Sequence, residues 1–154
     1  MNVMKVCLKF IIGLLCIFTL TGCIGEDYDV GPPTAYMDVD SSKIKLKEAN
    51  ILWTGSISIN KVAKNFQQLA SKQKQVNVSP LQSVNLEFEE NKENGGEYTD
   101  VSVNVFLWQG DKQEQLECKD NTFTFPNKKG TYVLEVDFYS HTGDIKYVGN
   151  VVIK

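Results

Sequence analysis

The chain contains no arginine, and all 16 of its basic side chains are lysines. The planar guanidinium of arginine is the usual bidentate partner of phosphates and base edges, so its absence removes the main tool of nucleic-acid recognition. The formal net charge is −3, and this sign repels a polyanion. We therefore expect no nucleic-acid partner. The same sign argues against an electrostatic attachment to anionic lipid.

Patterns that carry catalysis or bind metals are also scarce. The chain has one histidine, His141, and neither a Gly-x-Ser-x-Gly elbow nor a phosphate-binding glycine loop. Ser-x-x-Lys matches begin at Ser42 and Ser58, but both overlap alternating strand patterns, in which residues i and i+3 point to opposite faces. His141 lies in a predicted hairpin turn near Asp144, and no motif places a nucleophile beside it. We expect no catalytic residue, no cofactor and no metal site, and we do not expect an enzyme.

The apolar run from Val6 to Leu20 is too short for a permanent membrane span, which needs about 20 apolar residues. It follows a short basic region and ends in small residues, a layout typical of an export signal. The boundary "LTGC" at residues 20 to 23 resembles the lipobox of bacterial lipoproteins. The resemblance implies that residues 1–22 are removed and that Cys23 carries a diacylglyceryl group.

Two acyl chains are enough for a stable membrane anchor. The following stretch "GEDYDVGPP" has no apolar periodicity and predicts a tether, so that residues 23–33 form an acylated N-terminal link. We therefore expect a lipid-anchored protein on the extracytoplasmic side of the cell membrane, with its membrane partner reached through the N-terminal lipid.

The four cysteines do not predict a disulfide framework. Cys7 and Cys16 leave with the signal, and Cys23 becomes a thioether, so Cys118 is the one expected thiol. Its place in Leu116-Glu117-Cys118 favours a small buried hydrophobic side chain over a reactive or intermolecularly bridged thiol.

The remaining sequence, residues 34–154, alternates between apolar and polar residues over many short runs, a pattern typical of half-buried strands. Short strands at this spacing predict one mainly β domain built as a sandwich or barrel. One segment, from Asn60 to Gln75, instead has helical spacing with Asn60 as its cap, which predicts one short helix. The phase of the strands places one set of residues inward, with Trp108 on the opposite phase: Val103, Val105, Leu107, Tyr132, Leu134 and Val136.

The segment "NKKGTYVLEVDFYSHTGDIKYVGNVVIK" resembles the last two strands of bacterial immunoglobulin-like domains. Gly130 and Tyr132 match the Gly-x-Tyr that leads into a strand, and Tyr132 resembles the tyrosine corner of such domains. Lys128 stands where an Asp often precedes the Tyr, and Leu134 occupies the position of the second disulfide cysteine. The resemblance implies an antiparallel immunoglobulin-like β-sandwich, to which the helical spacing noted above adds one short helix.

A cluster of carboxylates around a predicted hairpin admits two interpretations. It is either solvated charge that protects a strand edge or a collector of a hard cation such as calcium, and the first is favoured. The cluster comprises Glu87, Glu89, Glu90, Glu93, Glu97 and Asp100.

These features together predict a membrane-anchored extracytoplasmic lipoprotein that acts as a non-catalytic binding or adaptor module of the cell envelope. The alternative is an envelope enzyme or an enzyme inhibitor. Aromatic side chains in or beside predicted turns are the candidate anchors for an envelope protein or glycan, because exposed aromatics dominate binding energy once they are buried. They are Tyr98, Trp108 and Tyr139.

The lipobox predicts that Cys23 is acylated. Cells that produce the chain should incorporate a labelled acyl precursor into it, and Cys23→Ala should abolish the label and release the protein from the membrane fraction. A wild-type chain that takes up no label, or that fractionates away from the membrane, would contradict the anchor.

Overall fold

The structure is a computed structural model that describes residues 31–54, 58–90 and 98–154. The predicted signal, Cys23 and all of the tether before residue 31 lie outside the described residues. Within the described part the chain is mainly β, with two sheets and one short helix, as the sequence predicts.

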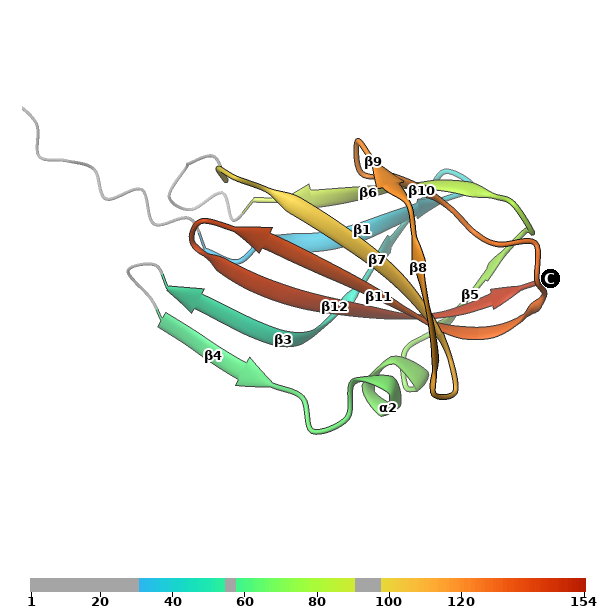
Figure 1. Ribbon diagram of the computed structural model, residues 1–154, viewed down its shortest axis with the longest axis horizontal. Coiled ribbons are helices and arrows are strands. Elements are labelled where there is room, and N and C mark those ends of the chain that lie inside the picture. The colour runs from blue at the N-terminus through green and yellow to red at the C-terminus, as the bar shows by residue number, and fades with distance from the viewer. Residues whose placement is uncertain (1–30, 55–57, 91–97) are drawn as a thin grey trace, which may run out of the picture.

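The two sheets differ in size but share an antiparallel plan (Figure 1). The smaller sheet has the strand order β2 (Ser42–Lys45), β1 (Thr34–Val39), β6 (Ser83–Glu89), β10 (Thr122–Thr124) and β9 (Cys118–Lys119). The larger sheet has the order β4 (Ser58–Val62), β3 (Lys47–Thr54), β12 (Gly143–Ile153), β11 (Gly130–Ser140), β7 (Ser102–Gln109) and β8 (Lys112–Leu116). One further strand, β5 (Gln75–Val78), runs parallel to the end of β12.

One hydrophobic core lies between the two sheets, because each contributes its inward face. Met37 and Phe123 from the smaller sheet and Leu134 and Tyr147 from the larger one are at most 1% exposed. The six residues predicted to face inward do so, five of them buried and Val103 packed against the core. Among the described residues, the members of this core lie between Ala35 and Ile153.

Two tyrosine hydroxyls tie neighbouring segments to the long β11–β12 hairpin. Tyr147 donates a hydrogen bond to the carbonyl of Pro33 at 2.5 Å, which ties the start of the domain to β12. Tyr132 donates one to the carbonyl of Lys128, four residues earlier, at 2.9 Å. Burial raises the pKa of both phenols, so both remain hydrogen-bond donors at neutral pH.

The predicted helix from Asn60 to Gln75 is wrong at both ends, since helix α2 spans only Phe66–Ser71. Residues 58–62 instead form β4, because Val62 pairs with Asn50 of β3. The cap is Asn65 and not Asn60: its side chain accepts a hydrogen bond from the backbone N–H of Gln68 at 2.9 Å. Strand pairing therefore outweighs local helical spacing over residues 60–62.

The alternating run from Lys43 to Lys47 predicts one strand, but it is divided between the two sheets. β2 ends at Lys45 in the smaller sheet, and β3 begins at Lys47 in the larger one. Leu46, 2% exposed, points into the core at the crossing and donates its backbone N–H to Ala35 at 2.9 Å. Burial of this one side chain explains why the chain changes sheet there.

Residues 31–154 should fold without the segment that precedes them, because they contain both sheets and the core that the described residues form. We expect a β-type circular dichroism spectrum and a single cooperative urea transition. A mainly helical spectrum, or a transition without cooperativity, would contradict the two-sheet arrangement.

Candidate functional site

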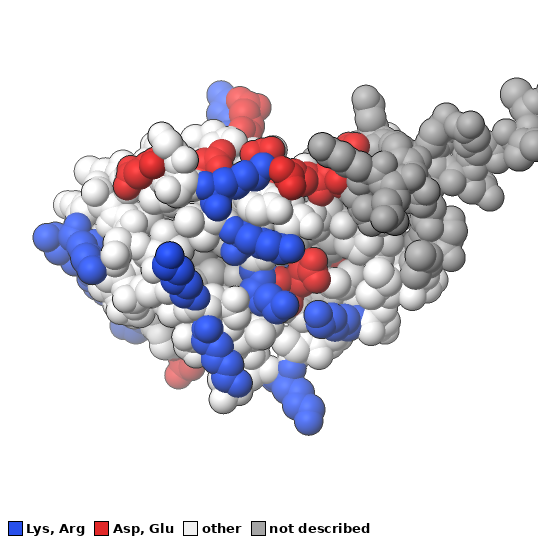
Figure 2. All heavy atoms as spheres, turned by 180° about the vertical axis from the view of Figure 1, so that it is seen from behind, with Lys and Arg blue, Asp and Glu red and all other residues white. Residues whose placement is uncertain are grey.

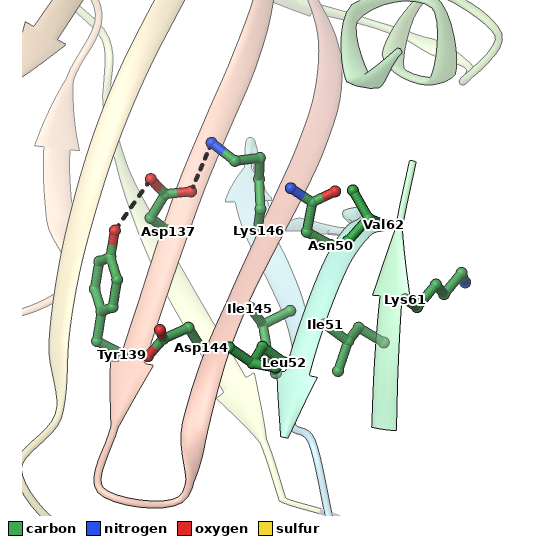
Figure 3. A pocket seen from close by; sticks show the side chains of 10 residues that line it. All are labelled: Asn50, Ile51, Leu52, Lys61, Val62, Asp137, Tyr139, Asp144, Ile145 and Lys146. Carbon is green, nitrogen blue, oxygen red and sulfur yellow. Dashed lines mark hydrogen bonds and ion pairs between the residues drawn. The ribbon is translucent and has the colours of Figure 1, made fainter. Parts of the chain in front are cut away.

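A hollow of about 310 Å³ crosses the outer face of the larger sheet, from β4 through β3 and β12 to β11 (Figure 3). Successive side chains of a strand point to opposite faces, so outward positions of adjacent strands converge here. Its lining combines aliphatic, aromatic and charged side chains from Asn50, Ile51, Leu52, Lys61, Val62, Asp137, Tyr139, Asp144, Ile145 and Lys146.

Large apolar side chains are exposed within this hollow. Leu52 is 52% exposed, Val62 71% and Tyr139 36%. They are three of the five large hydrophobic side chains that are exposed among the described residues, and all three line the same hollow. Such convergence distinguishes them from singly scattered surface hydrophobics, which need no explanation.

A buried ion-pair network forms one border of the hollow. Glu135 and Asp137 are two residues apart on β11 and so share its outer face, and Lys146 of β12 lies directly opposite Asp137. Lys146 pairs with Glu135 and, at 3.2 Å, with Asp137. The Glu135 side chain is only 3% exposed, and it also accepts a hydrogen bond from Trp108 Nε1 at 2.7 Å.

Helix α2 covers the end of this network. The Phe66 ring packs edge-on against Trp108, with ring centroids 5.5 Å apart. The ammonium group of Lys146 lies 5.3 Å from the Phe66 ring centroid, a distance at which the cation attracts the ring face. Ala70 of the helix is fully buried in a second, smaller core on this face of the sheet. The helix therefore shields the Glu135–Lys146 pair from water.

The two ends of the Lys146–Asp137 pair respond differently to burial. For Lys146, burial alone lowers the pKa. The hydrogen bond to Glu135 and the charge of Asp137 together raise it by more than burial lowers it, so the net shift of the pKa is upward. For Asp137, burial and the nearby Glu135 raise the pKa more than Lys146 lowers it. Asp137 Oδ1 is buried and accepts no hydrogen bond with good geometry from the described residues, its contact being the ion pair with Lys146.

The structure places the three predicted aromatic anchors in different settings. Tyr139 lines the hollow, and its hydroxyl donates to Asp137 at 3.4 Å (Figure 3). Trp108 lies on the same outer face, but its β11 neighbour, Val133, is six residues from Tyr139. That separation is about 20 Å along the strand. The structure thus does not bring Trp108 and Tyr139 together.

Tyr98 packs against the main core. Its ring contacts Trp53 and Phe138 edge-on, with centroid distances of 5.9 and 5.5 Å. Its hydroxyl donates to the carbonyl of Gly31 at 2.9 Å. Tyr98 therefore helps to hold the start of the domain against the core.

Cys118 and His141 lie away from the hollow's lining. Cys118 is a half-buried free thiol packed against the core, and burial raises its pKa, which disfavours the reactive thiolate. His141 is exposed, with its Nδ1 2.8 Å from Thr99 Oγ1.

The predicted acidic cluster is only partly described. Glu87 and Glu89 both pair with Lys43, the former at 2.9 Å, whereas Glu93 and Glu97 lie outside the described residues. Among the residues that the structure describes, no group of three or more His, Cys, Asp or Glu side chains could hold a metal ion. Glu87 and Glu89 therefore act as partners of a lysine on a sheet surface.

Sequence reasoning missed Leu52, Val62 and the network around Lys146. A signal was present for the network, because Glu135 and Asp137 interrupt an otherwise apolar strand at positions that share a face. Leu52 gave a weaker signal, since it lies between the inward-facing Ile51 and Trp53. Val62 gave none, because its spacing fits a helix.

Comparisons with protein-family models, with curated proteins and with solved structures find no match. In the part of the chain that the structure describes, no helix has the length and apolar character needed to cross a bilayer.

Removing Lys146 should be costly, because Lys146→Met leaves Glu135 charged and buried without its cation. We expect a loss of about 3 kcal/mol in the free energy of unfolding at neutral pH, measured by urea denaturation. Adding Glu135→Gln to Lys146→Met should recover much of that loss, which a double-mutant cycle detects. Additive effects of the two substitutions would contradict a coupled pair.

The same pair predicts a pH dependence with a definite sign. Folding raises the pKa of Lys146. The stabilisation that the charged ammonium group provides is therefore fully present at pH values below the ordinary pKa of lysine, and it is lost as the pH rises through the raised pKa of the folded protein. The wild-type protein should therefore lose stability at strongly alkaline pH more steeply than Lys146→Met. Parallel alkaline slopes in urea denaturation would show that the pair contributes nothing.

Proposed function

We propose that this chain is a lipid-anchored binding module of the bacterial cell envelope that holds its partner in the hollow between β4 and β11. The observation that carries the proposal is the convergence of Leu52, Val62 and Tyr139 on one hollow beside a buried charge network. Exposed apolar side chains gain most on being covered, and fixed polar groups beside them give orientation. The partner we propose is an envelope protein or glycan.

We also propose an immunoglobulin-like topology for the frame. In such domains one sheet has the strand order A-B-E-D and the other G-F-C, with C′ added in some classes. The order β1-β6-β10-β9 corresponds to the first, and β12-β11-β7-β8 corresponds to the second. The hydrogen bond from Tyr132 to the Lys128 carbonyl supports a tyrosine corner at the start of the strand that corresponds to F.

On this interpretation, residues 42–78 are an insertion between the first two strands of the frame. The insertion supplies β2, β3, β4, helix α2 and β5. It extends the larger sheet beyond β12 and contributes Leu52 and Val62 to the hollow. The binding site is therefore built where the inserted strands meet the frame, which agrees with the general rule that function resides in sites added to a common fold.

The size and charge of the hollow limit its ligand. Its volume is at the low end of the range for ligand pockets, which start at about 300 Å³. Two lysines and two aspartates line it, so their formal charges cancel. It is suited to a few neutral groups of a larger partner, such as apolar side chains or a sugar ring, and not to a highly charged ligand.

Crosslinking in intact cells tests this function. The full chain should be captured with an envelope partner, and Leu52→Asp should reduce the capture at least about tenfold, because it puts a charge where apolar surface is covered. Leu81→Asp is the matched control, since Leu81 is also a large exposed side chain, 63% exposed, but does not line the hollow.

Equal capture by wild type and Leu52→Asp would remove the hollow as the binding site. Turnover of an envelope substrate by the purified protein, lost in His141→Ala, would overturn the binding function in favour of an enzyme.

A further inference from the structure

Four exposed lysines lie together where β2 passes into β3 and where helix α2 leads into β5. They are Lys45, Lys47, Lys72 and Lys74, and we call them the lysine face. Lys45 and Lys74 line the same small hollow of about 120 Å³. Figure 2 shows lysine side chains gathered across the middle of one side of the molecule, with acidic side chains mostly along its upper border.

Backbone contacts hold the two halves of the lysine face side by side. Lys47 pairs with Val148 of β12, two residues before Asn150. The Asn150 side chain donates to the carbonyls of Ser71 and Gln73, at 3.4 and 3.3 Å, and so holds the residues on either side of Lys72 against β12. The positions of these lysines are therefore set by the sheet.

Neutralising partners are few at this surface. None of the four lysines forms an ion pair with a described residue, whereas Lys43, on the same strand as Lys45, is bound by Glu87 and Glu89. Glu48 follows Lys47 and is the nearest carboxylate in sequence, and Asp40 accepts a hydrogen bond from Gln82 at 3.0 Å. The lysine face is thus locally cationic in a chain whose formal net charge is −3.

The lysine face adjoins the point where the chain enters the domain. Lys45 pairs with Tyr36 of β1, and the intervening Leu46 is hydrogen-bonded to Ala35. Pro33, just before β1, is buried and held by Tyr147. Residues between Cys23 and Pro33 can span at most about 35 Å even when fully extended, so a lipid at Cys23 keeps this end of the domain close to the bilayer.

We propose that the lysine face docks on the anionic phosphate headgroups of the membrane that holds the lipid anchor. This rests on the proposed membrane attachment, and it adds a fixed orientation of the domain on the bilayer. The net charge of the chain argues against such contact, but local charge decides it, because screening limits electrostatic attraction to about 10 Å. Each lysine near an anionic surface contributes about 1 kcal/mol, or roughly a fivefold increase in affinity.

Vesicle co-sedimentation of residues 31–154, which contain both sheets and the core of the described residues, tests the docking without the lipid anchor once the cooperative urea transition expected above shows that they fold. The vesicles are phosphatidylcholine alone, or phosphatidylcholine mixed with phosphatidylglycerol. We expect binding to the anionic vesicles only, and its loss at high ionic strength.

The variant K45Q/K47Q/K72Q/K74Q should weaken this binding at least about fiftyfold, a conservative bound beside the roughly 600-fold that four independent lysines would give. The matched control K112Q/K119Q/K129Q/K154Q removes the same number of exposed lysines from other surfaces and should retain most of the binding. Circular dichroism of both variants checks that they fold.

Three results would overturn the docking: no binding to anionic vesicles, equal losses in the two variants, or tighter binding to soluble polyphosphate than to the vesicles. The last would indicate a phosphate polymer in place of a lipid surface. Neither the acyl group nor an envelope partner takes part in this measurement. A negative result would therefore not contradict acylation of Cys23 or partner binding in the hollow, and a failure of either of those hypotheses would not change the vesicle result.

Discussion

The pairing of β12 with three other strands holds the larger sheet together. β12 pairs with β11 along its whole length, with β3 over its first half and with β5, in parallel, over its last four residues. This arrangement requires close approach at Gly143, where an added Cβ would lie 2.2 Å from the Leu52 carbonyl oxygen. Its inward side chains, Tyr147 among them, fill the core, and its outward ones form the floor of the hollow.

The outward face of β12 shows how the core and the candidate site depend on each other. Lys146 is held between two carboxylates of β11, and the helix closes over one of them. A buried ion pair of this kind contributes little net stability, but it is costly to break. A shift in the register of β11 and β12 would therefore be penalised on their outer face by the broken ion pair, as well as on the inner face by the apolar core. Tyr139 and Asp137 occupy fixed positions in the hollow as a result.

The mainly β class and the inward phase of the central strands could be predicted from the sequence, because strict alternation leaves one choice of buried face. The bounds of helix α2 could not, since residues 60–62 have helical spacing and only their pairing with β3 makes them a strand. The hollow could not be predicted from the sequence either. Its side chains come from four strands, and the sequence does not reveal that β3 and β4 extend the sheet beyond β12.

The segment between β1 and β6 carries what is distinctive in this chain. Strands β1, β6, β7 and β8 to β12 enclose most of the core by themselves, and the central buried pairs belong to them. Residues 42–78 contribute Leu46, Ile51, Trp53 and Val78 to that core. They also supply Leu52, Val62 and all four residues of the lysine face. Substitutions at the exposed positions of this segment, unlike those at its buried ones, should alter stability by less than about 0.5 kcal/mol. The exposed positions of residues 42–78, Leu52 and Val62 among them, can therefore vary while the core stays packed, and under the proposed binding function these positions are where specificity for the partner is set.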